Sequence, residues 1–181
     1  MKERTQFIAR LAILIALTLI IQMIGLPQPA TGPVINMLLF LTFWILDLKA
    51  AIIIGTLTPL IAVWRGQLPA ILFPMIPFII AANTVLVIAL AGVIKFARHF
   101  LKTQLKSHPH IFDVIGILIS SFCKFIVLFL AAKILLPLLM GTILPEKAIF
   151  MMSTPQLITA FIGGGLALAL VHFLKRIRIL N

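Results

Sequence analysis

The chain has 181 residues, of which 62% are hydrophobic and only 10% are charged, and its formal net charge is +11. Soluble domains are about 45–50% apolar and about 25% charged, and a domain of this size cannot bury such an excess of apolar residues in one core. The composition therefore excludes a soluble protein. It predicts an all-α polytopic membrane protein, with residues 1–181 forming a single integral membrane domain.

Six apolar segments of the chain could each form a helix that crosses the bilayer, which takes about 20 residues. The first extends from about Phe7 to Leu26 and is followed by the sequence GLPQPATGP. The other five are expected over about residues 34–46 (or from nearer Thr31), 48–64, 77–95, 112–139 and 155–174. Prolines 69, 74 and 77 remove backbone donors, so we expect a broken or re-entrant piece of helix just before the fourth segment.

The distribution of basic residues predicts the orientation of the bundle. Six crossings place both termini on the same side of the membrane. That side collects 11 of the 15 Lys and Arg residues, whereas the opposite loops hold only Arg65 and Lys147. Cytoplasmic loops are enriched in Lys and Arg, so both termini are predicted to be cytoplasmic.

Two lysines lie within the fifth apolar segment, Lys124 and Lys133. A charge at the bilayer centre costs about 2.5–3.5 kcal/mol on insertion scales. Lys133 is near the outer end, where its side chain can reach the interface. Lys124 is about 18 Å from the inner end, at 1.5 Å per residue. Lys124 therefore predicts either a solvated or ligand-filled cavity or a hydrogen bond to a neighbouring helix.

Further polar residues are expected near Lys124. Ser120 and Ser121 precede it by four and three residues and are expected on the same helix face. Most other intramembrane polar residues map to the outer half, which favours a binding cavity that opens outward. Hydrogen bonds between helices, worth about 0.6 kcal/mol each, are the alternative explanation. The candidates for substrate binding are Lys124, Ser120, Ser121, Asn83, Asn36, Gln156 and Thr159.

Catalytic and metal-binding functions find little support in the sequence. HExxH, GxSxG and P-loop motifs are absent, and the single cysteine, Cys123, belongs to no cluster with metal-ligand spacing. The four acidic residues lie at segment ends, and the four histidines fall on or near the cytoplasmic side. We therefore expect no enzyme, no metal site and no cofactor. We also expect no means of powering uptake without an ATPase.

Small residues mark two helix faces that could pack closely. In the first segment, ARLAILIALTLI contains Ala12 and Ala16 four residues apart, with Ala9 about one turn earlier. Such spacing lets another helix approach closely in lipid, whether that helix belongs to a partner or to this chain. A second site, FIGGGLALAL at residues 161–170, is expected to pack within the chain.

A chain with six helices, cytoplasmic ends and AxxxA in the first helix resembles the substrate-binding S component of an energy-coupling factor (ECF) transporter. Members of that family are also resembled by residues 31–88, with the sequence TGPVINMLLFLTFWILDLKAAIIIGTLTPLIAVWRGQLPAILFPMIPFIIAANTVLVI. The resemblance implies a prokaryotic-type plasma membrane subunit that captures a vitamin or similar micronutrient with high affinity. It also implies docking through Ala9, Ala12 and Ala16 onto a transmembrane coupling protein that binds two cytoplasmic ATPases.

The same resemblance implies a lid formed by a loop from Gln28 to Gly32, which adds Gln28 and Thr31 to the candidate site. Lys124 favours an anionic ligand. An apolar lining that includes Phe73, Phe78, Phe122 and Met75 would suit a ring system. Biotin-, pantothenate-, folate- and corrin-like compounds and haem fall within the family's range. A scaffold subunit without a ligand and a stand-alone small-molecule permease are the alternative functions.

Overall fold

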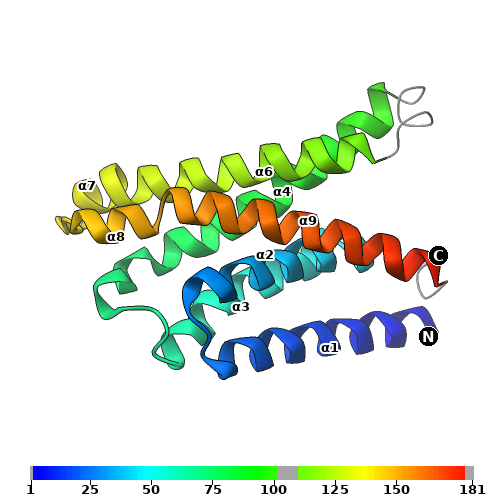
Figure 1. Ribbon diagram of the computed structural model, residues 1–181, viewed down its shortest axis with the longest axis horizontal. Helices are drawn as coiled ribbons and strands as arrows, with labels where there is room; N and C mark the ends of the chain where they lie inside the picture. Colours follow the sequence, from blue (N-terminus) through cyan, green and yellow to red (C-terminus); the bar gives the residue numbers. More distant parts are fainter. Residues whose placement is uncertain (1, 102–109, 178–181) are drawn as a thin grey trace.

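The computed structural model describes residues 2–101 and 110–177, and the regular structure in these ranges is entirely helical (Figure 1). The six long helices are α1 (Lys2–Ile24), α2 (Gln28–Ile45), α3 (Leu48–Trp64), α4 (Ile76–Phe100), α6 (Ile111–Leu130) and α9 (Thr154–Arg176). The short elements are η1 (Ala70–Met75), η2 (Ala131–Leu135), α7 (Leu136–Met140) and α8 (Glu146–Met151). The predicted all-α bundle is confirmed.

Several helices have the length and composition of membrane spans. Among the described residues, four continuous stretches qualify: Arg4–Ile24, Ala70–Phe100, Ile111–Met140 and Glu146–Arg176. Helix α3 is apolar but shorter, and α2 begins with the polar sequence QPATGP. Both termini lie at one end of the bundle, beside the end of α4 and the start of α6 (Figure 1). The basic residues Lys95, Arg98, Lys175 and Arg176 belong to the helix ends on that side.

The connection between α1 and α2 is shorter than the sequence suggested. Helix α1 ends at Ile24, Gly25 adopts a left-handed φ of 76°, and α2 begins at Gln28 after Pro27. Proline is favoured in the first turn of a helix, where its missing N–H is not needed. The residues of GLPQPATGP therefore form a turn and a helix start. This helix therefore begins earlier than either expected start, residue 34 or near Thr31. The expected loop at Gln28–Gly32 is wrong, because these residues are helical.

Prolines also shape the outer ends of the fourth and fifth segments. As predicted, a separate piece, the 3-10 helix η1, precedes α4 and contains Pro74. After α6, the helix continues as the π-helical turn η2, where Leu136 N–H donates to Ala131 O, five residues earlier. Pro137 cannot donate a backbone hydrogen bond, and the regular α-helical pattern is interrupted just before it.

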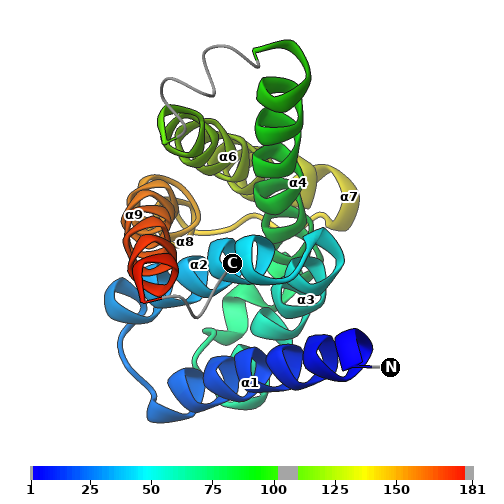
Figure 2. The ribbon, with the colours of Figure 1, turned by 90° about the vertical axis from the view of Figure 1, so that its right-hand side faces the viewer.

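Helix α9 holds the bundle together by close packing against α2 and α6 (Figure 2). A Cβ atom added at Gly163 would lie 2.5 Å from Pro33 O and 2.7 Å from Asn36 Cβ. One added at Gly164 would collide with the Ile117 side chain on α6. The GGG sequence is therefore an internal packing site, as expected. Gly163 and Gly164 lie about 100° apart around α9, so α2 and α6 pack on adjacent faces of this helix, and Asn36 of α2 meets Lys124 of α6.

Helix α1 is the least embedded of the long helices. It lies along one side of the molecule, where it contacts only α2 and α3 extensively (Figures 1 and 2). Within its apolar stretch 17% of the residues are buried, compared with 39% for Ile111–Met140. The buried stripe of α1 is Leu14, Thr18 and Gln22, one residue per turn. The remaining surface of α1 is left for lipid or for another protein.

Candidate binding cavity

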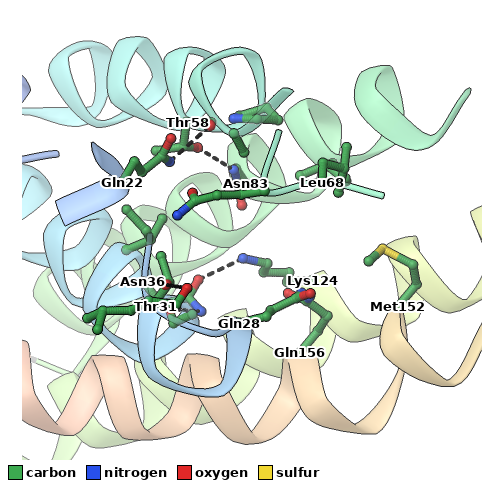
Figure 3. Close-up of a pocket in the computed structure, with 17 residues that line it drawn as sticks. Gln22, Gln28, Thr31, Asn36, Thr58, Leu68, Asn83, Lys124, Met152 and Gln156 are labelled. Atoms are coloured by element: carbon green, nitrogen blue, oxygen red, sulfur yellow. Dashed lines mark hydrogen bonds between the residues drawn. The ribbon is translucent and has the colours of Figure 1, made fainter. Parts of the chain in front are cut away.

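A cavity of about 140 Å³, drawn in Figure 3, is lined by residues from the half of the bundle opposite the termini. It is formed by the last turns of α1 and α3, the first turns of α2, α4 and α9, the middle of α6, and the segment after α3. Its lining residues are Gln22, Leu26, Gln28, Thr31, Gly32, Ile35, Asn36, Thr58, Pro59, Ala62, Gln67, Leu68, Ile79, Asn83, Lys124, Met152 and Gln156. In the orientation predicted from the basic residues, this half of the bundle is the outer half.

One side of the cavity, which we call the lysine wall, consists of Gln28, Asn36, Lys124 and Gln156 (Figure 3). Lys124 is 4% exposed, and its Nζ donates to Asn36 Oδ1 over 2.7 Å. Asn36 Nδ2 donates to Gly32 O over 3.0 Å. A carbonyl oxygen can only accept, so the Nδ2 end of the Asn36 amide faces Gly32 O. The amide oxygen of Asn36 therefore faces Lys124, which can only donate.

The environment of Lys124 combines both sequence-based alternatives, since it bonds to a neighbouring helix and also lines a cavity. An ammonium group carries three N–H donors, and Asn36 accepts only one of them. No acidic side chain lines the cavity in the part of the chain that the structure describes. The remaining donors of Lys124 are therefore available to a bound molecule.

The opposite side, which we call the amide wall, consists of Gln22, Thr58 and Asn83 (Figure 3). Gln22 Nε2 donates to Thr58 O over 2.9 Å. Asn83 Nδ2 donates to Gly55 O over 2.9 Å and to Thr58 Oγ1 over 3.2 Å. These bonds join α1, α3 and α4 and fix the direction in which each amide points.

Close packing of α3 against α4 makes the amide wall possible. A Cβ added at Gly55 would lie 3.1 Å from Asn83 Cβ, so a larger residue there would push Asn83 away from the Gly55 carbonyl. Gly55 and Asn83 are both buried. The glycine thus positions a polar side chain, just as Gly163 does for Asn36.

The structure brings together most of the predicted candidates. Lys124, Asn36, Asn83, Gln28, Thr31 and Gln156 all line the cavity. Thr159 does not; its hydroxyl lies behind Asn36, from which it accepts a hydrogen bond over 3.4 Å, and it donates to Gln156 O over 3.1 Å. Thr159 therefore contacts the lining residues without joining them.

The two serines expected beside Lys124 do not reach the cavity. Ser120 Oγ donates to Ile117 O of its own helix over 3.1 Å, and Ser121 is fully buried. Both lie about one turn, or about 5 Å, closer than Lys124 to the end of the bundle that carries the termini. On α6 the cavity reaches Lys124 but not the two serines. Lying on the same helix face as Lys124 was therefore not sufficient to bring the serines into the cavity.

The expected aromatic lining is also absent from the cavity. Phe73 and Phe122 are exposed at 42% and 52%, and neither they nor Phe78 and Met75 line the cavity. Phe122 precedes Lys124 by two residues, which turns it about 200° around the helix at 100° per residue. Its ring therefore points outward, where lipid would cover it.

Three polar lining residues were missing from the candidate site: Gln22, Thr58 and Gln67. Gln22 and Thr58 belong to the set of intramembrane polar residues in the outer half, so the sequence signal existed but did not distinguish them from their neighbours. Gln67 follows the end of α3 in an irregular segment. No sequence pattern indicates that its side chain turns inward.

The alanines expected to bind a partner point away from the bundle. Ala9, Ala12 and Ala16 are all exposed. At 100° per residue they lie on the opposite side of α1 from Leu14 and Thr18, which are 5% and 1% exposed. Packing within this chain therefore does not use the AxxxA face.

Two other charged residues from the sequence analysis, Asp47 and Lys133, lie away from the cavity. Asp47 Oδ1 accepts from Ala50 N over 2.7 Å and caps the start of α3. Lys133 is exposed, with its Nζ 5.5 Å from the centre of the Phe129 ring. The described residues contain no group of three His, Cys, Asp or Glu side chains arranged to bind a metal ion.

Comparison with known families now explains this arrangement. The protein-family model described as "ECF transporter, substrate-specific component" matches residues 6–174 of the chain. The chain belongs to this family. It is thus a multi-pass plasma membrane protein and a substrate-binding transport subunit rather than a member of a known enzyme family. Members of the family bind small-molecule substrates and work with a membrane coupling protein and ATPases.

No curated protein matches this sequence, and no solved structure matches its fold. The identity of the substrate must therefore be inferred from the cavity of this chain.

Proposed function

We propose that this S component captures a vitamin or related micronutrient from outside the cell, with high affinity, in the cavity between the lysine wall and the amide wall. The observation that carries the proposal is the convergence of polar side chains on one space in an otherwise apolar bundle. Gln22, Asn36 and Asn83 come from three different helices and are each at most 3% exposed. Buried polar groups in membranes are costly and mark binding sites.

The size of the cavity supports a small substrate. Pockets for drug-sized ligands measure about 300–1,000 Å³, and this cavity measures about 140 Å³. A compound of the size of pantothenate or biotin is therefore favoured over a folate, a corrin or a haem. Lys124 has no acidic neighbour among the described residues that line the cavity, which favours an anionic group on that compound.

We further propose that the chain docks through α1 on a transmembrane coupling protein that binds two ATPases. Exposed Ala9, Ala12 and Ala16 form a strip of small side chains on which a partner helix could pack closely. The apolar side chains that flank the strip, such as Ile13 and Ile20 at 60% and 56% exposure, would extend that contact.

The test is mass spectrometry of small molecules released from the purified, denatured chain, combined with identification of copurifying proteins. We expect one compound to recur across preparations, and we expect a coupling protein with an ATPase pair. If no small molecule were released in any preparation while the coupling protein and ATPases still copurified, a scaffold subunit would be favoured. Uptake into vesicles that contain no ATPase would favour a stand-alone permease.

A further inference from the structure

Two atoms of the cavity lining are buried polar groups without a partner. Gln22 Oε1 and Gln67 Nε2 make no hydrogen bond within the part of the chain that the structure describes. Both residues line the cavity, and Gln22 is only 3% exposed. The third such atom among the described residues, Ser121 Oγ, lies off the cavity. Nearly all buried polar groups in proteins have partners, and Gln22 and Gln67 both face a space in which a ligand can supply the missing bonds.

The chemistry of these two atoms is complementary. Gln22 donates through Nε2 to a backbone carbonyl, so its Oε1 must be the free acceptor and requires an N–H or O–H donor. Gln67 Nε2 is a donor and requires an acceptor oxygen. A secondary amide or ureido group carries both an N–H donor and a C=O acceptor, and thus meets both requirements.

The lysine wall requires a different group on the same molecule. Lys124 has N–H donors beyond the one accepted by Asn36, and no carboxylate of this chain faces it among the described residues. A carboxylate on the ligand would accept charge-assisted hydrogen bonds there. The nearby amide nitrogens do not repel an anion, because they are neutral.

We infer that the substrate is a small, non-aromatic carboxylic acid that also carries a secondary amide or ureido group. Its carboxylate binds at Lys124, and its amide or ureido group binds between Gln22 and Gln67. The absence of Phe, Tyr and Trp from the described cavity lining removes the stacking surface that an aromatic ring would use. This inference rests on the proposed capture function and specifies its substrate class.

The experiment is a thermal-stabilisation screen of the full-length chain in lipid nanodiscs. The compound set contains small carboxylic acids with and without an amide or ureido group, neutral amides, amines, sugars and aromatic acids. We expect stabilisation by carboxylic acids that carry an amide or ureido group. For the best of them, the methyl ester of the acid and the analogue with oxygen in place of the amide N–H should each bind at least about tenfold more weakly.

Two variants assign the two ends of the ligand. Lys124→Met should abolish the preference for the acid over its methyl ester. Gln67→Leu should reduce affinity for the amide-bearing acids, since Gln67 Nε2 then no longer donates to the ligand. Gln67 makes no side-chain hydrogen bond within the described residues, so its replacement should leave the melting temperature of the free protein unchanged.

Three kinds of result overturn the inference. Stabilisation by neutral, cationic or aromatic compounds instead would overturn the substrate class while leaving substrate capture intact. Equal binding of the amide and its oxygen analogue to the unaltered protein would show that Gln22 and Gln67 do not recognise the ligand. Failure of every class to bind would contradict substrate capture itself, and this inference with it.

Discussion

Helices α1 and α9 both carry small residues at close-packing spacing, yet the structure uses them in opposite ways. The glycines of α9 face inward, where Gly163 contacts α2 and Gly164 contacts α6. The alanines of α1 are exposed and lie on the opposite side of the helix from its buried stripe. A small-residue motif shows where another helix can pack closely. Whether that motif is buried or exposed in the structure indicates whether the other helix belongs to this chain or to a partner.

The two helices also contribute differently to the cavity. Helix α9 supplies Gln156 to the lysine wall and also acts through position, because its glycines let Asn36 of α2 and Lys124 of α6 meet. Helix α1 supplies Gln22 to the cavity and is attached there by the bond to Thr58 O. The proposed docking helix therefore reaches the proposed substrate site directly, at the end distant from the alanines.

The largest expected effect is that of Gly163→Leu. The added Cβ would meet backbone atoms of α2 that cannot move independently, Pro33 O at 2.5 Å and Met37 N at 2.8 Å. We expect the free energy of unfolding to fall by about 3 kcal/mol, near the upper end for overpacked cores. Thermal unfolding of the detergent-solubilised protein measures this.

Gly165→Leu is the matched control for Gly163→Leu, since a Cβ at Gly165 meets no atom within 4 Å. Its stability should remain within about 0.5 kcal/mol of the unaltered protein. If the two leucine variants were equally stable, the inward packing of α9 described here would be wrong.

A second large effect is expected on assembly rather than on folding. Leucine at both Ala12 and Ala16 would keep a partner helix from approaching closely, and we expect at least about tenfold less copurifying coupling protein, equivalent to about 1.4 kcal/mol. Quantitative mass spectrometry of the purified complex measures the ratio. Stability should be unchanged because both positions are exposed.

Ala169→Leu, at an exposed position on α9, provides the control for the alanine pair. It should leave the amount of coupling protein unchanged. Equal losses from the α9 variant and the α1 variant would remove the distinction between an outward docking helix and an inward packing helix.

The smallest effect is expected from Thr58→Val. Valine keeps the backbone carbonyl that holds Gln22 but removes the hydroxyl that accepts from Asn83 over 3.2 Å. Interhelical hydrogen bonds in membranes are worth about 0.6 kcal/mol, so stability should fall by about that amount. Thr84→Val is the control, because among the described residues the Thr84 hydroxyl donates to Ile80 O of its own helix and to no other helix. A larger loss in the control would contradict the assigned role.

Much of the fold was predictable because lipid imposes simple rules. Apolar length located the helices, and α3 was predicted with its observed bounds, Leu48–Trp64. Prolines predicted the break before α4. The start of α2 was not predictable from composition, because a proline- and glycine-rich sequence fits a loop as well as a first helical turn.

The candidate site was predictable at Lys124, because a lysine that is deep in an apolar segment requires compensation. Its partner Asn36 and the opposing Asn83 were found through their polar character in the outer half. The exclusion of Ser120 and Ser121 depends on where the cavity ends, and the inclusion of Gln67 depends on how an irregular segment folds. Both depend on packing between helices, which periodicity along one helix does not specify.

The central claim is that the cavity around Lys124 binds the substrate, and Lys124→Met tests it most directly. In one preparation, the amount of bound small molecule and the amount of copurified coupling protein are measured together, with Lys133→Met as the control. We expect Lys124→Met to reduce the bound small molecule at least about tenfold with assembly unchanged. Unchanged binding together with a destabilised bundle would contradict the claim, and would assign Lys124 to its hydrogen bond with Asn36 alone.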